Sequence, residues 1–172
     1  PGTPGRGNGW ERMVRGDLAE PVLRTQVDAV ADIGELYGDR VDLSRVGIRG
    51  WSFGGYLAAL AVLRRPDVFH AAVVGAPVTD WRLYDTHYTE RYLGHPEQEP
   101  DNYERTSLLT IRAEVQRPLM LIHGLADDNV VAAHTLQLSS ALLEAGHPHE
   151  VLPLSDTTHM TPQEEVAENL LL

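Results

Sequence analysis

The stretch "RVGIRGWSFGGYLAAL", residues 45–60, decides the fold. A β-like run over 46–49 leads into the pattern G-x-S-x-G at Gly50-Trp51-Ser52-Phe53-Gly54, and an apolar, alanine-rich run over 53–65 follows it. A strand that turns directly into a helix on a serine needs glycines on both sides, because the turn is too tight for side chains. We therefore predict strand, turn and helix here, with Gly50 and Gly54 both required and Ser52 raised at the end of the strand.

This arrangement is typical of the nucleophile turn in α/β-hydrolases. Ser52 is then the candidate nucleophile, and the backbone N–H of Phe53 points toward the same spot, where it can stabilise an oxyanion. The alternative is a glycine-rich turn that contains an incidental serine. The strand before the motif and the helix after it favour the nucleophile.

The rest of the chain alternates between helical and strand patterns. We predict helices over 10–15, 20–38, 131–145 and from 162 onward, strands over 71–75, 118–123 and 150–154, and a long polar and aromatic insert over 81–116. Short apolar strands separated by helices indicate a parallel sheet. The fold class is therefore α/β: an α/β-hydrolase fold with a mostly parallel sheet and helices on both faces, in one domain over 1–172. We expect this domain to be truncated at both ends.

Composition excludes several functions. The formal net charge is −11, which argues against nucleic acid or an anionic membrane as a partner. All 14 basic residues are arginine, so chemistry that needs a lysine amine is excluded, and the chain has no cysteine for thiol chemistry. No apolar run approaches the roughly 20 residues of a membrane span, and no signal peptide is visible. We expect a cytoplasmic protein.

A serine nucleophile needs a base and an orienting acid, which follow it in this fold in the order acid, then histidine. The segment "HGLADDNV", 123–130, supplies Asp127 or Asp128 after a strand, and "LPLSDTTHM", 152–160, supplies His159. All three positions follow the carboxyl ends of strands, where α/β sheets place their sites. The pair His147 and His149 lies in a turn at the opposite edge, and we expect no metal and no cofactor.

Four segments together resemble the catalytic domain of the prolyl oligopeptidase family, in its dipeptidyl peptidase IV-like branch: "GWSFGGYLAAL", "APVTDWRLYDTHYTERYLG", "HGLADDNV" and "LPLSDTTHM". The resemblance implies Ser52 as nucleophile, His159 as base and Asp127, rather than Asp128, as the acid. It also implies further N-terminal strands, a loop tyrosine that completes the oxyanion hole, and an N-terminal β-propeller. Many members carry tyrosine after the serine, so Phe53 should act in packing only.

The insert carries four aromatic residues at helical spacing: Trp81, Tyr84, Tyr88 and Tyr92. They form either a core stripe, which we prefer for Tyr92, or an aromatic box beside Ser52 that fits a compact side chain such as proline. The resemblance supports the box for the first three. It also places Val78 and Val130 in the walls and gives Asn129 a hydrogen bond to the substrate backbone.

The expected function is that of a serine peptidase that releases short peptides from the N-terminus of a peptide substrate, after proline or alanine. A homodimer through the catalytic domain is consistent with the family. An esterase or acyl-peptide hydrolase on the same triad, and a non-catalytic remnant of the fold, are the alternatives. Residues 1–172 alone are expected to lack peptidase activity, because the family's propeller and first strands are not among them.

Overall fold

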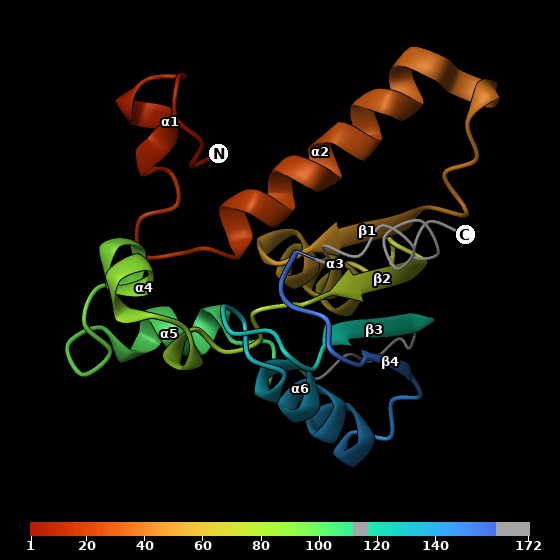
Figure 1. The fold of residues 1–172 in the computed structure, drawn as a ribbon. Helices are drawn as coiled ribbons and strands as arrows, with labels where there is room; N and C mark the ends of the chain where they lie inside the picture. The colour runs from red at the N-terminus through yellow and green to blue at the C-terminus, as the bar shows by residue number, and fades with distance from the viewer. Residues whose placement is uncertain (112–116, 161–172) are drawn as a thin grey trace.

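A parallel sheet of four strands forms the centre of the chain (Figure 1). The computed structural model describes residues 1–111 and 117–160. The strands are β1 (Gly47–Trp51), β2 (Ala71–Gly75), β3 (Leu119–Gly124) and β4 (Glu150–Leu154), in the spatial order β1-β2-β3-β4. Since all pairs are parallel, the four carboxyl ends lie at one edge of the sheet. The predicted parallel α/β architecture is confirmed.

Among the described residues, three helices flank the sheet: α2 (Glu20–Tyr37), α3 (Phe53–Arg64) and α6 (Ala133–Glu144). Helix α3 packs on β1 and β2, α2 packs against α3, and α6 contacts β3. The sequence of α3 is apolar nearly all round, and every residue from Gly55 to Leu63 is buried except Leu57, which is partly buried. A helix of that kind needs cover on every side, which the strands and α2 provide.

In its described part, up to residue 111, the insert between β2 and β3 folds as three short helices. They are η2 (Trp81–Leu83), α4 (Thr86–Leu93) and α5 (Pro100–Thr106). The Asp80 carboxylate accepts the N–H of Arg82 at the start of η2, and the Asp85 carboxylate accepts the N–H of Tyr88 at the start of α4. Each carboxylate caps the start of its helix, so Trp81 lies on η2, Tyr84 lies between the two helices, and Tyr88 and Tyr92 lie on α4.

Several predicted boundaries move. Helix α1 spans Asn8–Arg12, earlier than the predicted 10–15, and a 3₁₀ turn, η1 (Gly38–Arg40), follows α2. Strand β1 continues to Trp51, because Gly50 and Trp51 pair with Val74 and Gly75 of β2. The helix predicted from 162 onward lies outside the described residues. Within 1–111 and 117–160, no helix is both long and apolar enough to cross a membrane.

Candidate active site

Ser52 sits on the turn between β1 and α3 in a strained backbone conformation, with φ 57° and ψ −120°. Such angles are costly for a residue with a side chain and occur at functional turns. A Cβ on Gly50 would overlap the carbonyl group of Gly54, so the prediction for Gly50 is confirmed. The same prediction for Gly54 is wrong, since a Cβ placed there would meet no described atom within 4 Å apart from its chain neighbours and the backbone of α3 itself. The second close approach belongs to Gly55, whose Cβ would overlap the carbonyl oxygen of Gly75.

Two hydrogen bonds hold the backbone of Ser52. The N–H of Ser52 donates to Gly75 O at 2.9 Å, and Ser52 O accepts the N–H of Tyr56 at 3.0 Å. Phe53 is the first residue of α3, where N–H groups have no acceptor within the helix and the helix dipole favours negative charge. The Phe53 ring packs against the rings of Tyr56 and Trp81, with centroids 5.7 and 5.9 Å away.

Asp127 and His159 meet on the loops that follow β3 and β4. His159 Nδ1 lies 2.7 Å from Asp127 Oδ2, and the Asp127 side chain is fully buried while that of His159 is 11% exposed. The other carboxylate oxygen, Oδ1, accepts the backbone N–H groups of Asn129 at 3.0 Å and Val130 at 2.9 Å. A carboxylate can only accept here, so the proton of the histidine is on Nδ1 and Nε2 is left to act as a base. Asp128 is exposed.

A second buried histidine, His123, holds the loop that carries Asp127. His123 Nε2 lies 2.7 Å from the carbonyl oxygen of Val130, and Nδ1 lies 2.7 Å from Thr135 Oγ1. Burial lowers the pKa of His123, which keeps the ring neutral. A neutral ring that donates from Nε2 must accept at Nδ1, so Thr135 is the donor. The hydrogen bonds of His123 to Thr135 and Val130 therefore hold in place the loop that orients the Asp127 carboxylate.

The three candidate catalytic residues follow β1, β3 and β4 at the same edge of the sheet. The structure joins Asp127 to His159 by a hydrogen bond, whereas the Ser52 hydroxyl forms none with any residue of 1–111 or 117–160. Catalytic hydrogen bonds to a nucleophile are often long until substrate is bound.

The predicted pocket residues divide into two groups. Val78, Trp81 and Val130 are almost completely covered, with exposures of 2%, 1% and 0%. Tyr84 and Tyr88 are half-buried, and their rings contact each other edge-on at 5.5 Å. The Tyr84 hydroxyl donates to Asn129 Oδ1 at 2.8 Å, which connects the insert to the Asp127 loop. The three covered residues can therefore act only as packing behind the proposed pocket. Tyr84, Tyr88 and Asn129 have exposed surface that a substrate could contact.

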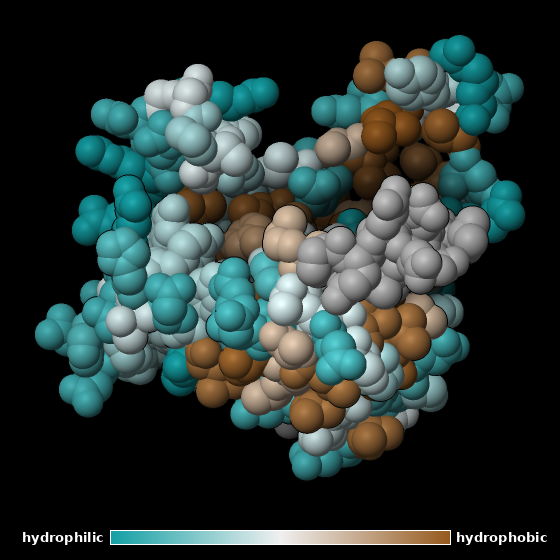
Figure 2. Space-filling view, viewed as in Figure 1, coloured by the Kyte–Doolittle hydropathy of each residue, from teal (hydrophilic) through white to brown (hydrophobic). Residues whose placement is uncertain are grey.

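A small cavity lies beside this aromatic cluster. It measures about 160 Å³ and is lined by Phe53, Tyr88 and Tyr92, together with residues 1–3 and three apolar side chains, those of Val14, Leu18 and Val22. Figure 2 shows apolar side chains at the bottom of the hollow between α1 and α2. Tyr92 thus lines a cavity as well as packing against Tyr88, at 5.0 Å between ring centroids.

Residues 1–171 match the model of the prolyl oligopeptidase family. The chain belongs to that family.

Comparison with two relatives and one solved structure shows how much of a full-length family member this chain covers. Mouse dipeptidyl peptidase 8 is 42% identical over 154 residues, which are 87% of this chain and 17% of that protein. Pig dipeptidyl peptidase 4 is 36% identical over 163 residues, 90% of this chain and 21% of that protein. The crystal structure of Porphyromonas gingivalis dipeptidyl peptidase 4 superposes with a TM-score of 0.91 at 34% identity, covering 99% of this chain and 24% of that one. The chain spans about a fifth of the length of these prolyl oligopeptidase relatives.

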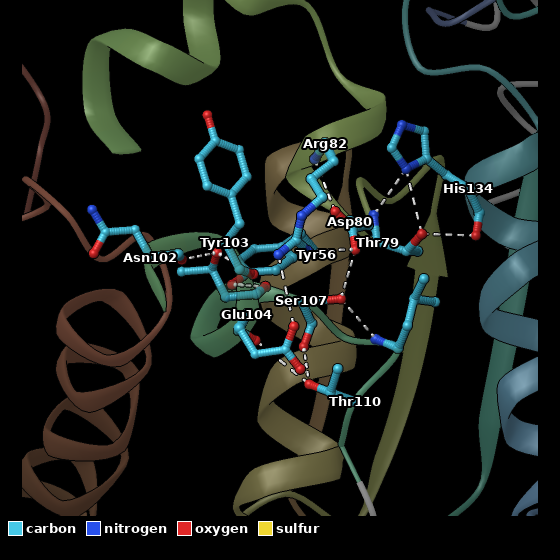
Figure 3. Close-up of polar contacts among 12 residues, drawn as sticks. Tyr56, Thr79, Asp80, Arg82, Asn102, Tyr103, Glu104, Ser107, Thr110 and His134 are labelled. Carbon is cyan, nitrogen blue, oxygen red and sulfur yellow. Dashed lines mark hydrogen bonds and ion pairs between the residues drawn. The ribbon is translucent and has the colours of Figure 1, made fainter. Parts of the chain in front are cut away.

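Buried polar contacts, which sequence reasoning missed, fix the start of the insert in this prolyl oligopeptidase family chain (Figure 3). His134 Nδ1 accepts the N–H of Thr79 at 3.1 Å, and Thr79 Oγ1 donates to His134 O at 2.9 Å. Burial lowers the pKa of His134 to about 4, so the ring is neutral. On the other side, Ser107 Oγ donates to Asp80 Oδ2 at 3.1 Å. The segment that precedes Trp81 is thereby held between α6 and α5.

No group of three or more His, Cys, Asp or Glu side chains that could hold a metal ion occurs in the described ranges. His149, which the sequence offers as half of a pair with His147, instead has Nε2 at 2.7 Å from Ser139 Oγ and Nδ1 at 3.0 Å from the carbonyl oxygen of His147. Both nitrogens of His149 are therefore occupied by ordinary structural contacts.

Proposed function

We propose that this chain carries the reactive centre of a serine peptidase that removes short peptides from the N-terminus of a peptide substrate, after proline or alanine. The observation that supports it most is the fully buried Asp127 carboxylate bonded to His159 Nδ1 at 2.7 Å, at the sheet edge where Ser52 sits in a strained turn. This is the acid–base half of a Ser-His-Asp triad. Membership of the prolyl oligopeptidase family and similarity to dipeptidyl peptidases 8 and 4 support the reaction type.

The proposed mechanism assigns one role to each of these groups. Ser52 Oγ attacks the carbonyl carbon of the scissile bond while His159 Nε2 takes its proton, and the Phe53 N–H donates to the oxygen that becomes negative. His159 then returns the proton to the leaving amine as the scissile C–N bond breaks, which leaves the N-terminal peptide bound to Ser52 Oγ as an ester. Water attacks this ester with His159 again as base, which releases the short peptide and restores Ser52.

The aromatic side chains give a basis for substrate preference. Tyr84 and Tyr88 offer edge and face surfaces to a compact ring, and Trp81 stacks behind Tyr88 at 6.0 Å. Burial raises the pKa of Tyr88 to about 12, so this tyrosine remains a neutral phenol. A small apolar pocket of this kind suits proline or alanine better than a charged or long side chain.

The test uses the full-length protein, that is, residues 1–172 with whatever sequence accompanies them. Ser52→Ala is compared with Ser140→Ala, an exposed serine on α6. We expect Ser52→Ala to lower turnover of a Gly-Pro chromogenic substrate by on the order of a million-fold and Ser140→Ala to change nothing. A fluorophosphonate should label Ser52 and no other serine.

Two further substrates, an N-acetylated Gly-Pro substrate and a simple ester, distinguish this peptidase from an acyl-peptide hydrolase and an esterase. An N-acetylated Gly-Pro substrate should be refused by a peptidase that needs a free amino terminus and accepted by an acyl-peptide hydrolase, and an esterase should prefer a simple ester. Activity of Ser52→Ala within about tenfold of the wild type would contradict the assignment of the nucleophile.

A further inference from the structure

The side chain of Trp51 connects the residue before the nucleophile to the proposed base. Its indole N–H donates a hydrogen bond of 2.7 Å to the backbone carbonyl oxygen of His159, across 108 residues of sequence. Trp51 is the last residue of β1 and directly precedes Ser52. One hydrogen bond therefore joins the turn that carries the serine to the loop that carries the histidine.

The indole reaches His159 because two neighbouring strands end in glycine. Gly75 pairs with Trp51 in the sheet, and a Cβ on Gly75 would overlap the six-membered part of the indole ring. Gly124, at the end of β3, lies so close to the backbone of the His159 loop that a Cβ there would overlap Thr157 O. The ring of Trp51 thus lies across the end of β2, and the loop after β4 comes down over the end of β3.

His159 is consequently held at two points from two directions. Its ring is held at Nδ1 by Asp127, from the loop after β3, and its main chain is held at the carbonyl by Trp51, from β1. The first contact alone permits the imidazole to swing about the carboxylate together with its loop. The second fixes the backbone from which the imidazole projects, and it does so from the residue next to Ser52.

We propose that Trp51 is a positioning residue, whose indole N–H sets the place of His159 Nε2 relative to Ser52 Oγ. The inference rests on the proposed function, since it assigns Trp51 a part in proton transfer between those two groups. A misplacement of about 1 Å between reacting groups can cost on the order of 100-fold in rate. The contact therefore acts on kcat rather than on substrate binding.

The experiment removes the donor and keeps an aromatic ring. Trp51→Phe is compared with Trp10→Phe in the full-length protein, because the indole of Trp10 also donates a hydrogen bond, to Thr3 Oγ1 at 3.0 Å, but does so on the exposed surface. We expect Trp51→Phe to lower both kcat and the rate of Ser52 labelling by a fluorophosphonate about 10- to 100-fold, with KM within about threefold. Trp10→Phe should match the wild type in all three.

Repeating the Trp51→Phe substitution in the His159→Ala variant distinguishes an effect on the position of His159 from a general loss of structure. In His159→Ala the residual labelling rate no longer depends on where the imidazole lies, so adding Trp51→Phe should lower that rate by less than about twofold. An equal further loss in this background would show that Trp51 acts on the structure at large and would overturn the inference. Should Trp51→Phe unfold, site-specific replacement of Trp51 by benzothienylalanine keeps the bicyclic ring and places sulfur where the N–H was, and the same fall in kcat is expected.

The outcomes also distinguish the two proposals. If His159→Ala retains full activity, the proposed function fails. If His159→Ala is inactive toward peptides while removal of the indole N–H leaves kcat unchanged, the triad stands and the role of Trp51 is wrong.

Discussion

Asp127 accepts a hydrogen bond of 2.7 Å from His159 on one oxygen, while two backbone N–H groups of its own loop occupy the other. The hydrogen bonds within its own loop therefore fix the orientation of the Asp127 carboxylate independently of His159. His159 lies on the loop after β4, and β4 pairs with β3 so that Leu154 lies opposite Gly124. The acid and the base are brought together by strand pairing, and they are aligned by the turn at 127–130.

The first prediction compares the two adjacent aspartates. Asp127→Asn should lower kcat roughly ten-thousand-fold, because an amide N–H facing Nδ1 favours the tautomer that carries its proton on Nε2 and cannot accept one from Ser52. Asp128→Asn is the matched control, since Asp128 is exposed, and it should stay within about threefold of the wild type. Steady-state turnover of a Gly-Pro chromogenic substrate measures both. An equal fall in kcat in the two variants would contradict the assignment of Asp127 as the acid of the triad.

The second prediction concerns the glycines of the turn. Gly50→Ala should abolish labelling of Ser52 by a fluorophosphonate, because its Cβ would meet the backbone of Gly54 and force the turn open. Gly54→Ala should fold normally and gain up to about 1 kcal/mol in free energy of unfolding, since alanine replaces glycine inside a helix where there is space. Urea unfolding and labelling, each measured on both variants, check this pair. A destabilised Gly54→Ala would show that the space is needed.

The third prediction concerns substrate preference. Tyr84→Ala and Tyr88→Ala should lower kcat/KM for a substrate cleaved after proline by about 10- to 100-fold more than for a flexible ester, because the ester does not need the ring surfaces. Tyr92→Ala is the control, because we assign Tyr92 to the core stripe, where its ring packs on that of Tyr88, and its loss should affect both substrates alike. A uniform fall in the first two variants, with a lower melting temperature, would support a core stripe instead.

The fourth prediction concerns acid stability. Burial lowers the pKa of His134 from 6.5 to about 4, so the unfolded state binds the proton more tightly than the folded state. This neutral ring therefore supports stability fully above pH 6.5, and the support is lost as the pH falls toward about 4. At 1.36 kcal/mol per pH unit, the loss approaches about 3 kcal/mol.

His134→Asn tests this prediction, because its amide oxygen can accept the Thr79 N–H and does not titrate. Urea unfolding at several pH values should show that the wild type loses more stability than the variant between pH 6.5 and about pH 4. Parallel pH dependence of the two proteins would mean that His134 does not titrate in this range.

The sequence was sufficient for the parts of this structure that local patterns specify. The strands over 71–75 and 150–154 are found at their predicted positions, and Ser52, Asp127 and His159 all follow strands as expected. Gly50 was identifiable because a tight turn constrains the residue before it. Gly54 was misjudged because the motif alone does not show which glycine faces backbone and which faces open space.

Contacts between distant segments could not be predicted in this way. The role of Trp51 depends on Gly75 beside it in the sheet and on a carbonyl group 108 residues away, and no local pattern contains all three. The bond between Thr79 and His134 spans 55 residues and likewise depends on how α6 packs. Strand β1 ran past its predicted end for the same reason, since pairing with β2 decides where it stops.

The order of the strands has a consequence for how such an enzyme can change during evolution. The proposed reactive groups follow β1, β3 and β4, whereas the connection after β2 supplies η2 and α4 and, with them, Tyr84 and Tyr88 of the proposed pocket. Under the proposed function, mutations in that connection can alter which peptides are bound while Ser52, Asp127 and His159 stay unchanged. The hydrogen bond between Tyr84 and Asn129 is where the two parts meet, so a graft of residues 81–94 from a relative should carry its selectivity across best when position 129 is exchanged with it.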